Sequence, residues 1–357
     1  MEISILDLNS FDKWNEVYSS FPDEVKDVYF SPAYYKVYEQ LGYGKAYCFL
    51  VQASNNTLMY PYLKRSLNDL KFSHPYKDFF DVEGAVGING ALTKNKIQLD
   101  ELIAYFNQAF VEYCAQNKIV TEFTRFNPIY ENQGLFTRTQ NVKVNDSVVV
   151  DLHVEDLMMK SYEHSVRKGI KKALRNDVSV YSKKPSQLDD DEIKAYLEIY
   201  QQTMDRNNAR DDYYFSRNYI EALFNNLNDN VLIFFSKWNN HLISTEIVLV
   251  GGNVGYSFLG GTDSKYYDLA PNILLKHEIN MELKRKGTRY FFLGGGTAPM
   301  DGIFKYKKCF AKNNVLGFYI GKKIHNQKIY QDLISLWEKH SPENVGKLPN
   351  FLTRYRL

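Results

Sequence analysis

The feature that most constrains the fold is a short pattern that occurs twice along the chain. Tyr-Phe-Ser stands at 29–31 and again at 214–216, and each copy precedes a helical pattern, a strand, an Asn-Asn turn and a second strand. The offset from Ser31 to Ser216 is 216 − 31 = 185, and that from Asn55 to Asn239 is 239 − 55 = 184. Chance similarity is the alternative, but two anchors in register favour one unit used twice.

The repeat continues in each half with a helix that leads into a strand. Apolar residues at helical spacing over 96–118 precede a predicted strand at 121–126, and those over 271–286 precede one at 290–293. Helices mixed with paired strands indicate α/β (mixed α+β) domains rather than a bundle or a sandwich. The boundary between the halves is expected near 151–153.

Composition excludes several classes of protein. Apolar residues make up 44% and charged residues 24% of the 357, which is ordinary for a globular protein of about two domains. A net charge of +2 does not indicate a DNA-binding surface. Three scattered cysteines fit a reducing compartment, and the seven histidines form no metal-spaced pair. Without a signal peptide or a membrane-spanning run, the sequence predicts a cytoplasmic protein with no metal.

A glycine-rich stretch at 290–310 is the first candidate site. An apolar strand ends at Gly294-Gly295-Gly296, where the backbone is free to approach another group closely, and an aromatic segment with three lysines follows. Those lysines are Lys305, Lys307 and Lys308. A ligand site and a plain loop before an edge strand with solvated lysines are equally open interpretations.

A basic helix is predicted over 154–176. Arg167, Lys171 and Arg175 share one face of it, which suits the phosphates of a donor or an activated sugar, although a solvated face explains the pattern slightly better. Further on, Arg206 belongs to a polar cluster at a helix end that fits either an acceptor or the last helix carbonyls. Asn272 follows Pro271 at a helix start, a weak anion-site signal.

Together these segments resemble the GNAT-fold acyltransferases of the Fem type, which transfer aminoacyl groups in peptidoglycan cross-bridge synthesis and have relatives in surface-polysaccharide gene sets. The matching pieces are 29–32, 123–128, the basic 165–173, 270–275, the triple glycine, and the most specific piece, 303–310. The resemblance implies tandem duplicated GNAT-like domains: a first at 1–152, a second with the catalytic site at 153–321, and a return segment at 322–357. It also implies that a helix at 327–340 completes the first domain.

The resemblance further implies roles for individual residues. Lys307 matches the lysine proposed in this family to stabilise the oxyanion when an amine attacks an acyl ester, which is physically sound because that charge develops only in the transition state. Tyr306 would shape the acyl pocket, Arg167 and Lys171 would bind phosphates, and Tyr256 and Asn272 would form the pocket rim. If 303–310 is a strand, Lys305 shares the face of Lys307, and only the resemblance separates them.

The expected activity is N-acyl transfer to an amino group of a cell-envelope sugar or peptidoglycan-type precursor, presented as a sugar nucleotide, a lipid-linked or a peptide precursor. Aminoacyl-tRNA and acyl-CoA are the two possible co-substrates, with no tightly bound cofactor. The loop 262–272 contains Asp263 and Asp268 and no glycine, which opposes ordinary CoA binding. The stretch 81–90 also lacks the tyrosines common there in the family. Two alternatives stay open: an acyl-CoA-dependent enzyme acting on a nucleotide-linked amino sugar, and a non-catalytic sugar- or protein-binding scaffold.

Overall fold

The two serines that anchor the repeat begin corresponding helices in the computed structural model, which describes residues 1–346 and 351–356. The Ser31 hydroxyl accepts a hydrogen bond from the Tyr34 amide (3.1 Å) at the start of α2 (Pro32–Gln40). The Ser216 hydroxyl accepts one from the Tyr219 amide (3.3 Å) at the start of α7 (Arg217–Leu227). A serine at this position satisfies an amide that has no partner within the helix, so the same residue starts the same helix in both halves.

The chain forms two structural units. Unit 1 comprises Met1–Val25, Tyr29–Val144 and Phe318–Leu357, and unit 2 comprises Lys26–Val28 and Asn145–Gly317. The chain changes unit within two strands, β7 (Gln140–Asp151) and β13 (Val315–Ile324).

Unit 1 contains a mixed sheet in the order β1-β2-β3-β4-β6-β13, in which only the β4–β6 pair is parallel and the short β5 is added beside β3. Its other strands are β1 (Glu2–Asp7), β2 (Lys45–Gln52), β3 (Thr57–Ser66), β4 (Phe80–Glu83), β5 (Leu92–Thr93) and β6 (Ile119–Arg125). Its other helices are α1 (Phe11–Ser19), α3 (Leu99–Gln116) and α10 (Gln327–His340).

Unit 2 repeats this arrangement in the order β8-β9-β10-β11-β12-β7, and again only one pair, β11–β12, is parallel. Its other strands are β8 (Ser179–Lys183), β9 (Val231–Trp238), β10 (His241–Gly251), β11 (Val254–Thr262) and β12 (Tyr290–Gly294). Its other helices are α4 (Leu157–Lys160), α5 (His164–Arg175), α6 (Asp190–Arg206), α8 (Pro271–Arg285) and α9 (Gly302–Lys308).

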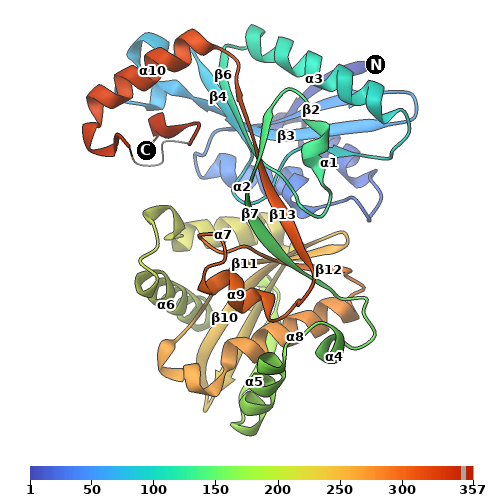
Figure 1. Cartoon of the computed structure of the whole chain (residues 1–357), viewed down its shortest axis with the longest axis vertical. Helices are drawn as coiled ribbons and strands as arrows, with labels where there is room; N and C mark the ends of the chain where they lie inside the picture. The colour runs from blue at the N-terminus through green and yellow to red at the C-terminus, as the bar shows by residue number, and fades with distance from the viewer. Residues whose placement is uncertain (347–350, 357) are drawn as a thin grey trace. The chain divides into compact units, whose positions relative to one another are not determined.

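The helices occupy matching places in both units. Two helices lie between the first and second strands of each unit in the chain, α1 and α2 in unit 1 and α6 and α7 in unit 2 (Figure 1). One further helix, α3 in unit 1 and α8 in unit 2, precedes the second strand of the parallel pair, which is β6 or β12. The mixed α/β fold with a tandem duplication is therefore confirmed. The Asn-Asn turns also recur, since Asn55 and Asn56 join β2 to β3 and Asn239 and Asn240 join β9 to β10.

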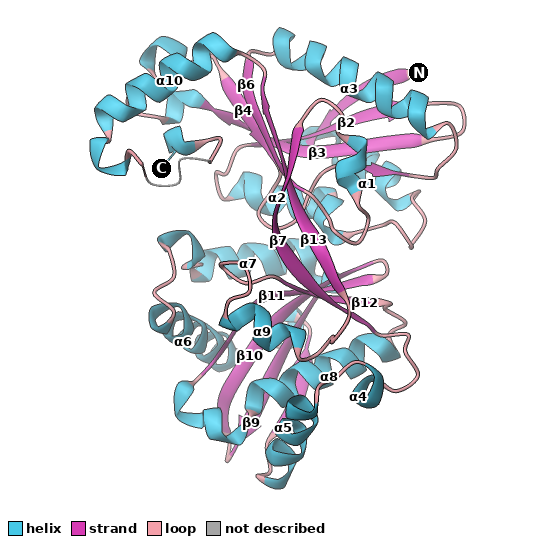
Figure 2. Cartoon of the chain, viewed as in Figure 1, coloured by secondary structure: helices cyan, strands magenta, loops and turns pink. Residues whose placement is uncertain are grey.

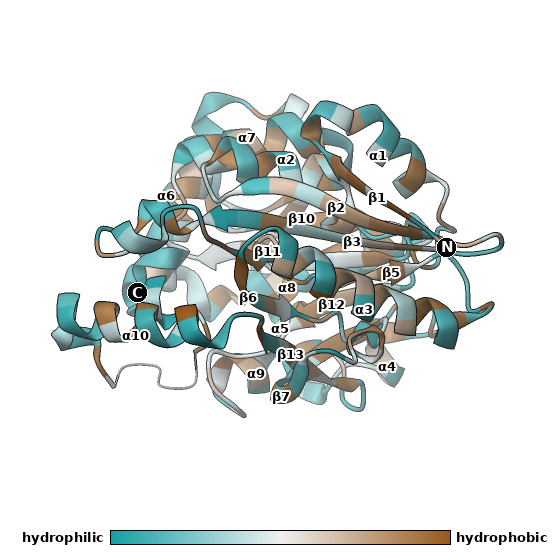
Figure 3. Cartoon of the chain, turned by 90° about the horizontal axis from the view of Figure 1, so that it is seen from above, coloured by the Kyte–Doolittle hydropathy of each residue, from teal (hydrophilic) through white to brown (hydrophobic). Residues whose placement is uncertain are grey.

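Each sheet buries an apolar face against its helices. In unit 1, Phe49 and Tyr60 of the sheet pack with Phe106 and Phe110 of α3, so sheet packing accounts for much of the aromatic content. In unit 2 the corresponding core joins sheet residues to α5 and α8. Alternating hydrophobic and hydrophilic colours along α10 in Figure 3 reflect an apolar face that packs against Leu67 and Val120 of unit 1. None of the described helices has both the length and the apolar character needed to cross a bilayer.

The structure differs from the sequence-based interpretation at two places. The segment 303–310, for which a strand was one possibility, contains helix α9 (Figure 2), because the Asp301 carboxylate accepts a hydrogen bond from the Phe304 amide (2.8 Å) and starts a helix there. The basic helix expected over 154–176 is divided into α4 and α5. The break lies at 161–163, where the Glu163 amide donates to the Cys309 carbonyl (2.8 Å) instead of continuing the helix.

The buried carboxylate of Glu122 makes unit 1 sensitive to acid. Burial raises its pKa, but Arg138 and His325 lower it more, to about 2. Because the folded pKa lies below the unfolded value of 4.5, the stabilisation is complete above that value and is lost as pH falls toward 2. We expect a loss of roughly 3 kcal/mol in the free energy of unfolding across this window. Urea unfolding at pH 6, 4 and 3 measures it, and Glu122→Gln should flatten the dependence.

Candidate active site

The two strands of the parallel pair in unit 2 separate partway along their length. β11 pairs with β12 only from Val254 to Tyr256, and β11 then continues to Thr262 with β10 alone as its partner. β12 ends at Gly294, whose φ of +73° is a conformation that favours glycine. The second half of β11 therefore has no strand beside it on the β12 side among the described residues, and the glycine-rich segment leaves the sheet at this point.

Helix α9 carries Lys307 back to that segment. The Lys307 ammonium donates a hydrogen bond to the Gly295 carbonyl at 2.7 Å. The loop is held by Asp301, whose carboxylate also accepts hydrogen bonds from the Thr297 amide (2.7 Å) and the Ala298 amide (3.1 Å). A side chain at Gly296 would collide with that carboxylate, which explains the third glycine. The sequence motif thus forms one closed turn that fixes the amine of Lys307.

The environment of Lys307 lowers its pKa to about 8. Burial is the largest cause and the charge of Lys276 is the second, while Glu246 and Asp301 oppose them. A lysine with this pKa exists in both protonation states near neutral pH, which suits a group that stabilises or exchanges charge during a reaction.

A buried ion pair beside Lys307 was not predicted from the sequence. Lys276 of α8 and Glu246 of β10, with side chains 7% and 4% exposed, bind each other, and the Lys276 ammonium also donates to the Ser257 hydroxyl of β11 at 2.7 Å. Two signals in the sequence mark it: Glu246 is the one charged residue in the neutral run 242–252, and Lys276 interrupts the apolar face of its helix. A charged residue within a buried run requires a partner of opposite charge, so these two signals could have predicted the Lys276–Glu246 pair.

The neighbours of Lys307 on α9 differ from it in exposure. The Tyr306 hydroxyl is buried and has no hydrogen-bond partner among the described residues. Burial, with Glu246 as a second cause, raises the pKa of that phenol well above its usual value. Lys305 is exposed, because two residues differ by about 200° around a helix axis. The helix therefore separates Lys305 from Lys307, whereas a strand would have placed both on one face.

The two predicted phosphate ligands of helix α5, Arg167 and Lys171, lie in different environments. The Arg167 guanidinium donates to the carbonyls of Met158 (3.0 Å) and Tyr162 (2.8 Å), so it closes the end of α4. Lys171 is exposed, and it lies within one cationic stripe on the outer face of the helix that makes no ion pair among the described residues. The stripe consists of Lys168, Lys171, Lys172 and Arg175.

The remaining candidates lie around β11 without meeting Lys307 directly. Arg206 donates to the Thr262 carbonyl at the end of β11 (3.3 Å) and covers the Tyr267 ring. Tyr256 is buried, and its hydroxyl donates to the Asp27 carboxylate. Asn272 is partly exposed in the first turn of α8, where the N-cap residue Ala270 offers no side-chain hydrogen bond to the helix.

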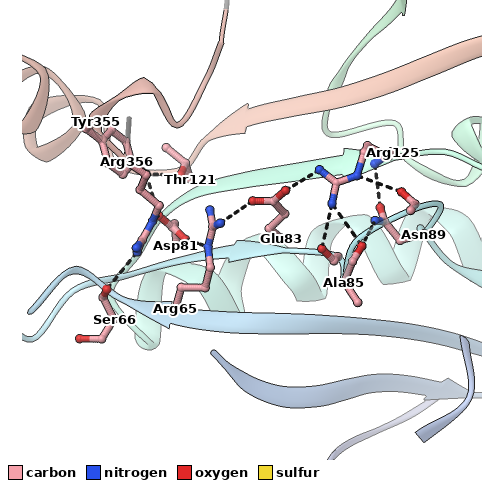
Figure 4. A network of polar contacts seen from close by, with 12 residues as sticks. Arg65, Ser66, Asp81, Glu83, Ala85, Asn89, Thr121, Arg125, Tyr355 and Arg356 are labelled. Atoms are coloured by element: carbon pink, nitrogen blue, oxygen red, sulfur yellow. Dashed lines mark hydrogen bonds and ion pairs between the residues drawn. The ribbon is translucent and has the colours of Figure 1, made fainter. Parts of the chain in front are cut away.

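Unit 1 contains its own buried carboxylates, and each of them is held by arginine side chains. The Arg138 guanidinium binds the Glu122 carboxylate and covers several aromatic rings, with side chains 3% and 0% exposed. A second network joins Asp81 and Glu83 to Arg65, Arg125 and Arg356 (Figure 4). Unit 2 differs, since Lys307 is bound to a backbone carbonyl and makes no ion pair among the described residues.

Comparisons with known proteins agree with this architecture. Residues 160–308 match the family model described as an acetyltransferase (GNAT) domain. No curated protein is significantly similar to the chain in sequence. Among solved structures, FemX matches with a TM-score of 0.67 and 12% identity over 93% of this chain and 99% of that one.

Two further structures match less closely. A conserved protein of unknown function from Bacteroides thetaiotaomicron matches with a TM-score of 0.57 and 13% identity, over 90% of this chain and 99% of that one. The C-terminal domain of a putative lysylphosphatidylglycerol synthetase from Agrobacterium fabrum matches with a TM-score of 0.52 and 12% identity, over 82% and 88%. The family match identifies the domain, and the structural matches show the fold. Residues 160–308 therefore carry a GNAT acetyltransferase domain, which indicates an acyltransferase, and the chain as a whole has the fold of FemX.

Proposed function

We propose that the protein transfers an aminoacyl group from charged tRNA to the amino group of a cell-envelope sugar or peptidoglycan-type precursor in the cytoplasm, forming an amide with Lys307 as the catalytic cation. One observation carries the proposal: the Lys307 ammonium is fixed on the Gly295 carbonyl at the point where β11 and β12 separate. An acyl carbonyl bound beside that ammonium would develop its negative charge within reach of a cation.

The other candidate residues support binding rather than chemistry in this proposal. Tyr306 offers a buried hydroxyl without a partner, which fits the polar end of an acyl group or the attacking amine. Arg206 binds the end of β11 and Asn272 lies in the first turn of α8, and in this proposal both contact the substrates. Arg167 acts by fixing α4 against α5, and Tyr256 by fixing the buried end of β11.

The exposed stripe on α5 favours a polyanionic donor. The helix contributes five Lys and Arg residues to a chain whose net charge is only +2, and four of them form the unpaired stripe. Such a concentration of cations attracts a phosphate backbone. Lys171 is therefore assigned to the donor surface, outside the reacting centre.

An acyl-CoA donor, with a nucleotide-linked amino sugar as acceptor, is the second candidate and has its own observation. The Asp263 carboxylate, which opposed CoA binding in the sequence, accepts a hydrogen bond from the Lys265 amide (3.0 Å) and so belongs to its own turn. The first turn of α8 has no side-chain cap, and its amides remain suited to a pyrophosphate.

Product analysis tests the proposal and separates the donors. The protein is incubated with charged tRNAs and with a panel of acyl-CoAs, each with amino-sugar nucleotides and peptidoglycan-precursor peptides, and products are detected by mass spectrometry. We expect an aminoacyl mass increment that requires charged tRNA. Products from acyl-CoA alone would establish the second candidate, and the absence of amide product from every pair would contradict both.

Charge reversal on α5 provides a further prediction. Lys171→Glu/Lys172→Glu should raise KM for charged tRNA about tenfold or more at low salt and leave kcat unchanged, because phosphate contacts govern affinity. Steady-state kinetics at two salt concentrations measure this. Lys13→Glu/Lys77→Glu, which reverses two exposed lysines in unit 1, is the matched control. An unchanged KM for tRNA would remove the stripe from the donor surface.

A further inference from the structure

The amine of Lys307 belongs to a group of charges supplied by three elements of unit 2. Lys276 comes from α8, Glu246 from β10, and Asp301 and Lys307 from the start and end of α9. Lys276 holds the Glu246 carboxylate directly, whereas Lys307 is bound to a backbone carbonyl. Lys276 also donates to Ser257, the first residue of β11 beyond its pairing with β12, and Lys307 is bound at Gly295, just past the end of β12. Both ammonium groups thus lie where the two strands separate, and only that of Lys276 contacts the buried carboxylate.

This division matters because the two lysines repel each other in a partly desolvated site. The Lys276–Glu246 pair is covered by protein, so its charges are screened less than those of a surface pair. Three charged side chains of the described residues act on Lys307: Lys276 disfavours its protonated form, and Glu246 and Asp301 favour it. Asp301 cannot be replaced without opening the loop that it closes. The Lys276–Glu246 pair is therefore the group of charges whose substitution should change the pKa of Lys307 while the loop stays intact.

We propose that Lys276 and Glu246 are positioning residues that set the protonation of Lys307, so that Lys307 exchanges a proton during acyl transfer as well as holding the oxyanion. The proton exchange rests on the proposed function, because it is a step of the acyl transfer. Its first test, however, needs no substrate, so the two proposals fail separately.

The proton balance of the transfer is simple. The acceptor nitrogen attacks the acyl carbonyl carbon, the C–N bond forms, and the carbonyl π electrons move to the oxygen, where the Lys307 ammonium stabilises them. When the bond from the acyl carbon to the leaving oxygen of tRNA, or to sulfur of a thioester, breaks, Lys307 gives its proton to that leaving atom. The resulting neutral amine then takes the proton released by the new amide nitrogen. Lys307 is restored, and the acceptor's proton ends on the leaving group.

The test measures the pKa of individual lysines in the intact protein. Trace labelling with acetic anhydride across a pH series, followed by mass spectrometry, reports the fraction of each lysine that is an unprotonated amine. Lys305 lies two residues away, is exposed and occurs in the same chymotryptic region, so it is the internal reference. In the wild type we expect Lys307 to titrate near pH 8.

Two single variants should shift Lys307 in opposite directions. Lys276→Met removes a repelling charge, so the pKa of Lys307 should rise from about 8 toward the 10.5 of an ordinary lysine. Glu246→Gln removes an attracting charge, so the same pKa should fall below about 8. Lys276→Arg retains the charge and should preserve the wild-type value. A merely structural ion pair predicts no opposed shifts, and unchanged or parallel titrations would overturn the proposal.

A neutral double variant keeps the test decisive if a single variant fails to fold. Lys276→Met/Glu246→Gln removes both charges and leaves neither unpaired, a replacement that buried ion pairs often tolerate. The pKa of Lys307 should then rise above the wild-type value, because the influence of Lys276 is larger than that of Glu246. An unchanged value would overturn the proposal here as well. Once a substrate pair is established, the pH profile of kcat should follow the same order.

Discussion

Lys307→Ala lowers kcat for acyl transfer by about 10²–10³-fold, the cost of removing one group that stabilises a developing oxyanion. The structure explains why no neighbour replaces it, since Lys276 is bound to Glu246 and Lys305 faces solvent from the same helix. KM should change little, because the lost interaction forms mainly in the transition state. Steady-state kinetics with the substrate pair found by product analysis measure both parameters.

Lys305→Ala is the matched control, because it removes the same side chain two residues away on α9. Its kcat should stay within a factor of two of the wild type. If both variants lose activity equally, the effect belongs to the helix and the role of Lys307 is wrong. Lys307→Arg adds a distinction: a fixed cation that cannot release its proton should retain some oxyanion stabilisation but should not regain the wild-type kcat.

Asp81→Ala destabilises unit 1 by about 3–5 kcal/mol, the range seen when one partner of a buried ion pair is removed. The Asp81 carboxylate is fully buried and binds the Arg65 and Arg356 guanidinium groups at 2.6 Å each (Figure 4). It also accepts a hydrogen bond from the Tyr355 hydroxyl (3.0 Å), so it ties the C-terminal segment to β4. Without it, two guanidinium groups lose their shared carboxylate.

Urea unfolding followed by tryptophan fluorescence measures this loss, since Trp14 and Trp337 both lie in unit 1. Asp78→Ala, which removes an exposed carboxylate three residues earlier, should change the free energy of unfolding by less than about 0.5 kcal/mol. A change of under 1 kcal/mol in Asp81→Ala would mean that the network is not a principal source of the stability of unit 1.

Much of the architecture follows from local sequence patterns. Ser31 and Ser216 predict two helix starts because a serine cap depends only on amides within the next turn. The helix expected at 327–340 is α10 with the same bounds. The strand considered for 303–310 does not form, because the Asp301 side chain caps a helix there.

The candidate site depended far more on the tertiary structure. The resemblance selected Lys307, but the residues themselves did not distinguish it from Lys305, and only helix α9 places the two side chains on different faces. Arg167 looked like a phosphate ligand because of its spacing, yet its guanidinium is held by the carbonyls at 158 and 162. Glu246 and Lys276 stand 30 residues apart, and no helical or strand period relates them.

The sequence by itself determined the doubled α/β fold, because periodicity, caps and turns act between residues close together in the chain. The tertiary structure alone decided which groups meet, since β10, α8 and β11 contribute Glu246, Lys276 and Ser257 to the site in which α9 places Lys307. The protonation of a partly buried amine depends on distances to groups that only folding brings near, and the strength of those interactions depends on the water that folding removes.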